Sequence, residues 1–291
     1  MKVDNAIIMA AGTSSRFAPL SYEKHKAMTV VKGEVLIERQ IKQLKDAGIP
    51  DIVIVTGYKA EQFDYLVLRY GIRLIPNPDY LTRNNNSSIW AAKDVLRNSY
   101  VCSSDNYFAE NPFEAEVDEA YYAAEYADGH TDEWCMTEDA QGYISSVSIG
   151  GKNAWYMLGH TFWSREFSEQ FMSILEAEYD LPETADKLWE KILMEHLDVL
   201  KMKIRKYAPS VIYEFDTLDE LRAFDKSYRM DTRSALIKKA ASALGVTEDK
   251  IVHLTSMKSS TTAAAGFQFD CKGDHYSYLY ESGILKKQSR K

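Results

Sequence analysis

The feature that most constrains the fold is a regular alternation of short apolar runs and amphipathic segments in the first hundred residues. The runs have the length of buried strands, and the segments between them repeat apolar residues at helical spacing. We expect strands over residues 6–10, 51–56, 72–75 and 100–103, and helices over residues 34–47, 60–70 and 88–97. Such alternation predicts an α/β fold, in which helices flank a mostly parallel sheet and ligands bind at the carboxyl ends of its strands.

The pattern changes after residue 113. Three short runs predict an antiparallel insert, and the remaining segments predict helices and one more strand. We expect insert strands over residues 133–137, 143–149 and 154–158, helices over 165–179, 185–196 and 217–228, and a strand over 211–215. The character changes again near residue 229, where a helix over 234–244 is followed by a stretch rich in Ser, Thr and Ala. We therefore predict one domain over residues 1–229 and a small C-terminal extension over 230–291.

Composition excludes several classes of protein. The 291 residues are 45% hydrophobic and carry a net charge of −8, which argues against a nucleic-acid-binding surface. No apolar run approaches the roughly 18 residues of a membrane span, and the first residues are too short and acidic for a signal peptide. The three cysteines form no CxxC pair, so we expect a reducing, cytoplasmic location.

The loop after the first predicted strand has the composition of an anion-binding loop. Residues 11–20 begin with small residues and one glycine, so backbone N–H groups can approach a phosphate, and Arg16 adds a fixed positive charge. Lys26 offers a second cation. The loop is neither a Walker A sequence nor a GxGxxG fingerprint. Taken alone, it fits an ordinary strand-to-helix turn equally well.

In combination with later segments, the loop resembles the nucleotidyltransferase family. Residues 10–16, Pro19 and Lys26 follow the signature A-A-G-x-G-x-R-x-x-P-x-T with its later P-K. Further matches, in the family's order, are residues 36–38, 55–58, 61–66, 84–88, 104–107 and 213–220. Within the family, the chain is most similar to the bacterial CTP:phosphocholine cytidylyltransferases, over about residues 5–228. The resemblance implies a Rossmann-like nucleotidyltransferase fold and transfer of CMP from CTP to phosphocholine, with release of pyrophosphate.

The resemblance also implies roles for individual residues. It assigns nucleotide binding to Ala10, Ala11, Gly12, Thr13, Ser14, Asn85 and Ser88, and catalytic contacts with the triphosphate to Arg16 and Lys26. The sequence departs from the signature at three places: Ser14 replaces a glycine, Ala18 an arginine and His25 a proline. Ser14 keeps a small side chain, so we expect the loop to survive. Ala18 removes a second arginine contact.

Two aspartates are candidates for Mg²⁺ binding. A phosphomonoester has its second pKa near ~6, so it needs no general base, but the reaction needs a metal held by one or two carboxylates. Asp105 follows the strand predicted over 100–103, and Asp216 ends the strand predicted over 211–215. The resemblance makes them the metal-binding pair. The alternatives are a turn or cap for Asp105 and a helix N-cap for Asp216.

The acceptor site is predicted from charge and aromatic residues. Residues 98–151 contain twelve acids and nine aromatic residues but no Lys or Arg. Carboxylates and aromatic faces suit a quaternary ammonium, although an acidic, solvated helix over residues 114–126 would explain most of them. We select Trp134, Tyr156, Asp186 and Trp189. Asp186 and Trp189 are three apart on one predicted helix face, and the resemblance places them near the choline pocket. A tryptophan at helical spacing is also typical of a core.

The extension and the overall function keep open alternatives. Residues 244–283 resemble the opening strands of a choline-kinase-like lobe, with residues 258–262 at the place of its nucleotide-contacting loop. No catalytic lobe follows in this sequence, so we expect packing, dimer contacts, regulation or a structural cap rather than kinase activity. The functional alternatives are a sugar-1-phosphate nucleotidyltransferase and a non-catalytic nucleotide sensor. We expect small-molecule partners and neither nucleic acid nor membrane insertion; a homo-oligomer remains open.

Overall fold

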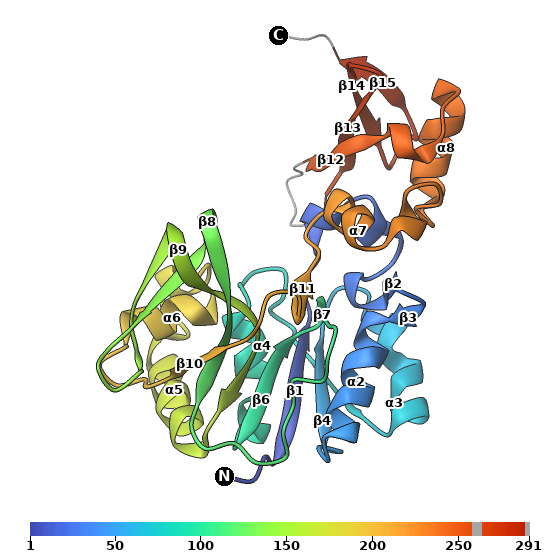
Figure 1. Cartoon of the computed structure of the whole chain (residues 1–291). Coiled ribbons are helices and arrows are strands. Elements are labelled where there is room, and N and C mark those ends of the chain that lie inside the picture. The colour runs from blue at the N-terminus through green and yellow to red at the C-terminus, as the bar shows by residue number, and fades with distance from the viewer. Residues whose placement is uncertain (258–263, 289–291) are drawn as a thin grey trace. The chain divides into compact units, whose positions relative to one another are not determined.

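The computed structural model describes residues 1–257 and 264–288. The chain forms two compact units (Figure 1). Unit 1 contains Met1–Gly12 and Leu36–Glu214, and unit 2 contains Thr13–Val35 and Phe215–Lys291. Each unit combines segments that are distant in the sequence, so the units do not test a domain boundary drawn at one point of the chain. The boundary near residue 229 stays a prediction.

Unit 1 is built on a seven-stranded sheet in the order β10-β8-β9-β6-β1-β4-β5. Its strands are β1 (Asn5–Ala10), β4 (Ile52–Thr56), β5 (Arg73–Pro76), β6 (Ser99–Ser103), β8 (Tyr121–Glu138), β9 (Ile144–Trp163) and β10 (Lys203–Lys206). Strands β5, β4, β1 and β6 run parallel, and β9 lies antiparallel between β6 and β8. A second, two-stranded sheet pairs β7 (Asn106–Phe108) with β11 (Ile212–Glu214). The mostly parallel α/β sheet predicted from the alternation is confirmed.

Helices cover this sheet as their apolar residues require. They are α2 (Leu36–Asp46), η3 (Ala60–Phe63), α3 (Asp64–Tyr70), α4 (Asn86–Ala91), η4 (Lys93–Val95), α5 (Arg165–Glu178), η5 (Pro182–Thr184) and α6 (Trp189–Glu195). In α2 the residues Leu36, Ile37, Ile41 and Leu44 form one face, and each is at most 1% exposed. Helices α5 and α6 pack beside β8 and β9, where their apolar side chains join one core cluster (Figure 1).

The predicted insert differs from the observed one. Two long strands, β8 and β9, replace the three short runs, and the alternative of a helix over residues 114–126 is wrong because β8 begins at Tyr121. Gly129 and Gly150 have positive φ angles of 98° and 77°, and the strand register shifts on both sides of the first of them. Glycines that suggest strand ends in the sequence are therefore irregular points inside continuous strands.

Unit 2 brings the loop segment and the C-terminal segment together. The loop segment contains η1 (Ser15–Phe17), α1 (Leu20–Glu23), η2 (Lys26–Met28), β2 (Val30–Val31) and β3 (Glu34–Val35). The C-terminal segment contains α7 (Leu218–Phe224), η6 (Lys226–Tyr228), α8 (Ala235–Leu244), η7 (Glu248–Lys250), β12 (Val252–Met257), β13 (Gly266–Cys271), β14 (Asp274–Leu279) and β15 (Leu285–Gln288). The last four strands form an antiparallel sheet in chain order. Residues 258–262, named above as a nucleotide-contacting loop, lie outside the described residues.

Within residues 1–257 and 264–288, no helix combines the length and the apolar character that crossing a membrane requires.

Candidate active site

The loop after β1 starts at the edge of unit 1 where the parallel strands end. The carbonyl of Ala11 accepts a hydrogen bond from the Tyr58 N–H at 3.0 Å. A Cβ on Gly57 would stand 2.8 Å from that carbonyl, so glycine allows this close approach. A Cβ on Gly12, by contrast, would meet none of the described atoms within 4 Å. The loop therefore leaves open space beside Gly12, as a phosphate-binding loop requires.

Ser14, near the start of unit 2, has a backbone conformation that favours glycine. Its φ of 49° and ψ of 44° lie in the left-handed region. An L-residue pays roughly 1–2 kcal/mol there, which explains why the family signature has glycine at this place. The serine thus keeps the backbone path of the loop at a conformational cost.

Three charged side chains meet inside unit 2. Asp216 forms an ion pair with Arg16 and a second one with Lys26, whose Nζ lies 3.2 Å from Asp216 Oδ1. The Arg16 side chain is 74% exposed, whereas that of Lys26 is 4% exposed. At position 25, where the family signature has proline, the histidine side chain has a structural role. Its Nδ1 accepts a hydrogen bond from the Ala27 N–H at 3.1 Å and caps η2, which begins at Lys26. Two cations and one carboxylate are therefore presented together.

Two carboxylates meet inside unit 1. Asp105 lies in the turn between β6 and β7, and Glu214 ends β11. Antiparallel pairing sets Asn106 opposite Glu214, and the carboxylate oxygens of Asp105 and Glu214 lie within 4.8 Å of each other. Hard oxygen ligands at this separation fit Mg²⁺, which binds oxygens at about 2.0–2.1 Å.

Glu214 was not among the residues predicted from the sequence. It precedes Asp216 by two positions, and alternate residues of an extended segment point to the same side. The residue between them, Phe215, is 3% exposed. The spacing of two residues between Glu214 and Asp216 is therefore the signal in the sequence that indicates Glu214 as a further carboxylate of the site.

The structure gives Asn85 and Ser88 partners within unit 1. The Asn85 side chain donates to Glu190 Oε2 at 3.1 Å and accepts from the Trp189 N–H at 2.7 Å. The Ser88 hydroxyl is buried and accepts from the Asn77 amide at 3.2 Å. Both side chains thus connect α4 to neighbouring segments, and their predicted role in nucleotide binding stays a prediction.

The hairpin of β8 and β9 carries two of the residues predicted for the acceptor. Trp134 lies on β8, is partly buried and packs against the core cluster shared with α5 and α6. Tyr156 lies on β9 directly opposite Glu125. Burial, followed by the charges of Glu125 and Glu133, raises the pKa of Tyr156 to about 12, so its hydroxyl stays protonated at neutral pH.

Asp186 and Trp189 do not share a helix face, because α6 begins only at Trp189. Asp186 is exposed in the turn before the helix. Asn84 holds this turn, since its backbone N–H donates to Ala185 O at 2.8 Å and its side chain to Asp186 O at 3.0 Å. Trp189 is 1% exposed and packs against Tyr122, with ring centroids 5.7 Å apart. Long-range hydrogen bonds from the asparagine segment, residues 84–86, thus override the helical spacing seen in the sequence.

Glu190 is a half-buried acid that was not among the residues predicted from the sequence. Its Oε1 accepts from the Tyr122 hydroxyl at 3.3 Å, and burial raises the pKa of its carboxyl group. Burial and the nearby Glu190 charge also raise the Tyr122 pKa well above its usual value. The Tyr122 and Trp189 rings stack at an interplanar angle of 14°. A carboxyl group bonded to one of two stacked aromatic residues is a combination that suits a cationic ligand.

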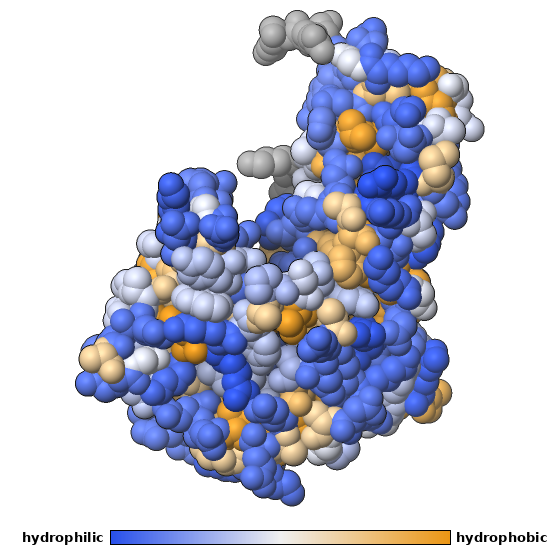
Figure 2. All heavy atoms as spheres, in the orientation of Figure 1, coloured by the Kyte–Doolittle hydropathy of each residue, from blue (hydrophilic) through white to orange (hydrophobic). Residues whose placement is uncertain are grey.

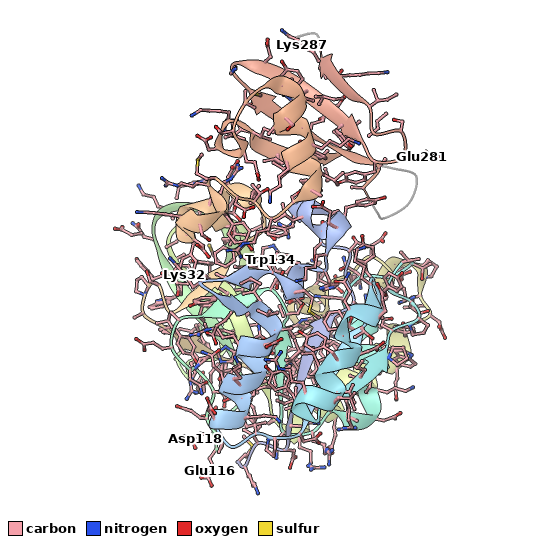
Figure 3. All side chains as sticks on the ribbon, turned by 90° about the vertical axis from the view of Figure 1, so that its right-hand side faces the viewer. Lys32, Glu116, Asp118, Trp134, Glu281 and Lys287 are labelled. Carbon is pink, nitrogen blue, oxygen red and sulfur yellow. The ribbon has the colours of Figure 1, made fainter. Side chains whose placement is uncertain are left out.

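The acidic stretch over residues 98–151 does not form one site. The Val3 N–H donates to Ala115 O, so the acids around residue 116 lie at the amino end of β1, opposite the edge with Gly12. Figure 3 shows Glu116 and Asp118 at the far end of unit 1 from Trp134. Other acids, such as Asp128, Asp132 and Glu133, lie exposed within β8, and the projecting part of the β8–β9 hairpin has a hydrophilic surface (Figure 2). Position in the sheet thus divides a stretch that is continuous in the sequence.

The parallel sheet, the glycine loop at its carboxyl edge and the carboxylates after β6 and on β11 are features of a nucleotidyltransferase, and residues 6–125 match the model of the MobA-like NTP transferase domain. A choline-phosphate cytidylyltransferase of Streptococcus pneumoniae is 33% identical over 221 residues, which cover 76% of this chain and 96% of that protein. The solved structure of CTP:phosphocholine cytidylyltransferase from the same organism has a TM-score of 0.74 at 32% identity and covers 78% of this chain and 99% of that one.

A 2-aminoethylphosphonate cytidylyltransferase of Lancefieldella rimae is 34% identical over 228 residues, which cover 77% of this chain and 93% of that protein. The chain therefore belongs to the family of nucleotidyltransferases that includes the choline-phosphate cytidylyltransferases, and it is an enzyme of that class.

Proposed function

We propose that the chain transfers CMP from CTP to phosphocholine with Mg²⁺ and releases pyrophosphate. The observation that carries this proposal is the 33% identity that extends over 96% of the choline-phosphate cytidylyltransferase of S. pneumoniae. A match over 221 residues is too long to depend on the loop after β1 alone. The assignment of individual residues within this function is our proposal.

The nucleotide is assigned to the loop and the residues around it. The backbone of residues 10–14 surrounds the phosphates, Arg16 and Lys26 supply positive charge, and Asn85 and Ser88 contact the nucleoside. The open space beside Gly12 and the shared pairing of both cations with Asp216 support this assignment. A triphosphate would replace Asp216 as the partner of Arg16 and Lys26, which frees that carboxylate.

Mg²⁺ is assigned to Asp105 and Asp216, with Glu214 added as a third ligand. The proximity of the Asp105 and Glu214 oxygens supports this donor set. Bound there, the metal would neutralise charge on the phosphates during transfer.

The protein has no proton to remove, because the acceptor phosphate is already ionised at neutral pH. A phosphate oxygen of phosphocholine attacks the α-phosphorus of CTP in line, and the bond from that phosphorus to the pyrophosphate breaks. Arg16 and Lys26 stabilise the charge of the departing pyrophosphate.

The acceptor's ammonium group is assigned to Trp134, Tyr156, Asp186 and Trp189, to which we add Glu190. The half-buried Glu190 carboxyl group accepts a hydrogen bond from Tyr122, whose ring stacks on Trp189, and this combination supports a cationic ligand. Since Trp189 is 1% exposed, it would act as a wall behind the other groups rather than as an open face.

A second acceptor, 2-aminoethylphosphonate, has a specific observation in its favour. The L. rimae relative named 2-aminoethylphosphonate cytidylyltransferase is 34% identical to the chain. The primary ammonium of 2-aminoethylphosphonate donates hydrogen bonds, whereas the methyl groups of choline prefer aromatic faces. The two acceptors therefore need different side chains in the same pocket.

The test is pyrophosphate release from purified protein with CTP or UTP and each of four acceptors: phosphocholine, phosphoethanolamine, 2-aminoethylphosphonate and a sugar 1-phosphate. We expect the highest kcat/KM for CTP with phosphocholine. Faster use of 2-aminoethylphosphonate would transfer the proposal to the second acceptor. Use of the sugar phosphate alone, or no turnover despite CTP binding, would favour the nucleotidyltransferase or sensor alternatives.

We place the reaction in the cytoplasm. All three cysteines are free and buried, which suits a reducing compartment.

A further inference from the structure

The C-terminal extension shares unit 2 with the loop segment and with α7. Helix α7 belongs to the part of the sequence that resembles the family, whereas the extension begins after residue 229. The similarity to the S. pneumoniae enzyme covers 96% of that protein but only 76% of this chain. The extension is therefore additional material, and its contacts show what it holds.

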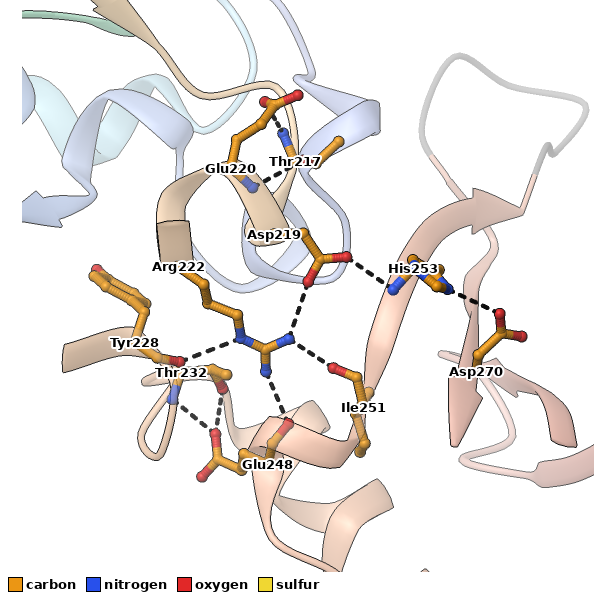
Figure 4. Close-up of polar contacts among 10 residues, drawn as sticks. All are labelled: Thr217, Asp219, Glu220, Arg222, Tyr228, Thr232, Glu248, Ile251, His253 and Asp270. Carbon is orange, nitrogen blue, oxygen red and sulfur yellow. Dashed lines mark hydrogen bonds and ion pairs between the residues drawn. The ribbon is translucent and has the colours of Figure 1, made fainter. Parts of the chain in front are cut away.

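Arg222 connects α7 to the extension (Figure 4). It is 7% exposed and donates from Nη1 to Ile251 O at 2.6 Å and from Nη2 to Glu248 O at 2.8 Å. It also donates to Tyr228 O at 3.3 Å and to Asp219 Oδ1 at 3.2 Å. A buried guanidinium with four oxygen partners fixes the distance between the elements that supply them. Two of those partners lie in η7 and immediately before β12, inside the extension.

Asp219 and His253 make a second connection between the same two elements. The His253 N–H donates to Asp219 Oδ2 at 2.8 Å, and the His253 side chain contacts Asp270 on β13 (Figure 4). Helix α7 is therefore held through Asp219 as well as through Arg222. A shift of the C-terminal sheet would move α7 with it.

The N-terminus of α7 is coupled to Asp216. Glu220 Oε2 accepts from the Asp216 N–H at 2.7 Å and from the Thr217 N–H at 3.0 Å, and the Thr217 hydroxyl accepts from the Glu220 N–H at 3.2 Å. This capping box fixes the backbone of Asp216 to the first turn of the helix. The position of α7 therefore sets the position of the carboxylate that pairs with Arg16 and Lys26.

The extension also contacts the loop segment directly. Arg233 of the extension donates to Val30 O at 2.8 Å, as does the hydroxyl of Tyr228, which lies just before the extension. Glu23 Oε1 accepts from the Leu236 N–H at 3.0 Å, at the start of α8. These contacts lie on both sides of Lys26 in the sequence, so the extension supports the buried lysine as well as Asp216.

We propose that the extension is part of the machinery that orders the phosphate-binding cations and Asp216, with Arg222 as the positioning residue. This inference rests on the proposed function, because Arg16, Lys26 and Asp216 are assigned there to the triphosphate and the metal. Arg222 touches none of the reacting groups. It acts through α7, so its loss should change nucleotide and metal binding and leave the acceptor alone.

The test compares Arg222→Met with Arg229→Met in the full chain. Arg229 lies seven residues further along and is exposed, so it controls for the loss of an arginine. For Arg222→Met we expect a rise of roughly tenfold in KM for CTP and in the Mg²⁺ concentration for half-maximal rate, with KM for phosphocholine unchanged. Calorimetric titration with CTP and Mg²⁺ in the absence of acceptor should show the same loss of affinity. Arg229→Met should match the wild type.

Tyr228→Phe provides a second variant in case Arg222→Met does not fold. It removes only the hydroxyl, which donates to Val30 O and accepts from Arg233 of the extension at 2.9 Å, and we expect a rise of about threefold in KM for CTP. Unchanged CTP affinity in a folded Arg222→Met protein, or in Tyr228→Phe where the first variant does not fold, would overturn the inference. So would equal losses for CTP and phosphocholine, which indicate a merely structural role. Wild-type turnover, measured in the same assay, tests the proposed function separately.

Discussion

The residues proposed for the nucleotide and those proposed for the acceptor depend on two different kinds of structure. Gly12 and Asp105 follow β1 and β6, two adjacent parallel strands of five or six residues. Trp134 and Tyr156 lie on β8 and β9, antiparallel strands of 18 and 20 residues with several register shifts. Short parallel strands end at one edge wherever they occur, whereas a long irregular hairpin can present its side chains in many ways.

Two regions of the hairpin of β8 and β9 differ in how far their side chains are exposed. At its base, His160 is fully buried, and its Nε2 is 2.9 Å from the Tyr121 hydroxyl. In the middle of β8, the His130 side chain is 76% exposed. Aromatic rings of neighbouring elements surround His160 at the base, whereas His130 lies in a part of the hairpin that is open to solvent. We therefore expect substitutions at the buried base to change stability and substitution of the partly buried Trp134 to change acceptor choice.

The largest effect should follow from Asp105→Ala, on the nucleotide side. Loss of one metal-binding carboxylate should lower kcat by about 10²- to 10³-fold, because charge stabilisation in the transition state is lost while the fold persists. The measurement is Mg²⁺-dependent pyrophosphate release, with circular dichroism as the check on folding. Asp118→Ala, an exposed acid at the other edge of the sheet, should retain full activity. Near-normal rates for Asp105→Ala would refute the metal assignment.

Lys26→Met should have the next largest effect. The side chain is 4% exposed and pairs with Asp216, so its ammonium is held in place for the phosphates. Its loss should weaken CTP binding by roughly 10- to 100-fold, as expected for a charge-assisted contact in a buried position. Calorimetric titration with CTP would measure this, with Lys24→Met as the exposed control from the same segment. Equal affinities in the two variants would remove Lys26 from the site.

The base of the hairpin should make stability depend on pH through His160. Burial, with a smaller contribution from the Arg205 charge, lowers the pKa of His160 to about 3, while an unfolded histidine titrates near ~6.5. Between these values the unfolded state binds more protons, so stability falls as the pH falls. At pH 5 this amounts to about 2 kcal/mol.

Urea unfolding at pH 7 and pH 5 would measure the effect. The loss of stability between the two pH values should be about 2 kcal/mol smaller in His160→Gln than in the wild type. In His130→Gln, where the side chain is exposed, the loss should equal that of the wild type. An unaltered loss in His160→Gln would show that the buried histidine does not contribute.

The sequence predicted most of the central sheet, and the placement of Gly12 and Asp105 after its strands, because local signals and topology agree there. Buried strands such as β1 and β4 consist of continuous apolar residues, and parallel strands necessarily bring their ends to one edge. Strand β10 was missed, since the charged segment Lys203–Lys206 becomes a strand only by pairing with β8. The pairing of Arg16, Lys26 and Asp216 joins segments 190 residues apart that composition cannot relate.

The acceptor side was less predictable for the same reason. Spacing placed Asp186 on a helix, but side chains of the asparagine segment hold that residue in a turn. Glu190 was overlooked because an acid in an amphipathic helix is normally solvated, and only the fold sets it beside Tyr122. Where tertiary contacts rather than local periodicity set the position of a side chain, one sequence carries too little information to find it.

The smallest expected effect tests the acceptor side directly, through Trp134→Leu. Trp134 is partly buried on β8, so it can present part of its ring to a ligand while the rest packs on the core. Methyl groups of choline gain from an aromatic face, whereas a primary ammonium depends on hydrogen-bond acceptors. One cation–π contact is worth about 0.5–2 kcal/mol, so the preference for phosphocholine over phosphoethanolamine should fall by roughly 3- to 30-fold.

The quantity to measure is the ratio of kcat/KM for phosphocholine to kcat/KM for phosphoethanolamine, with KM for CTP recorded in parallel. KM for CTP should stay unchanged, because Trp134 is assigned to the acceptor alone. Trp155→Leu is the matched control, since Trp155 is a partly buried tryptophan of the same hairpin that stacks edge-on against Tyr126. If both substitutions lower the ratio equally, the hairpin acts through its general shape, and the contrast between a fixed nucleotide side and a specific aromatic contact on the acceptor side disappears. If only Trp134→Leu lowers it, one ring on an irregular strand accounts for a measurable part of acceptor choice.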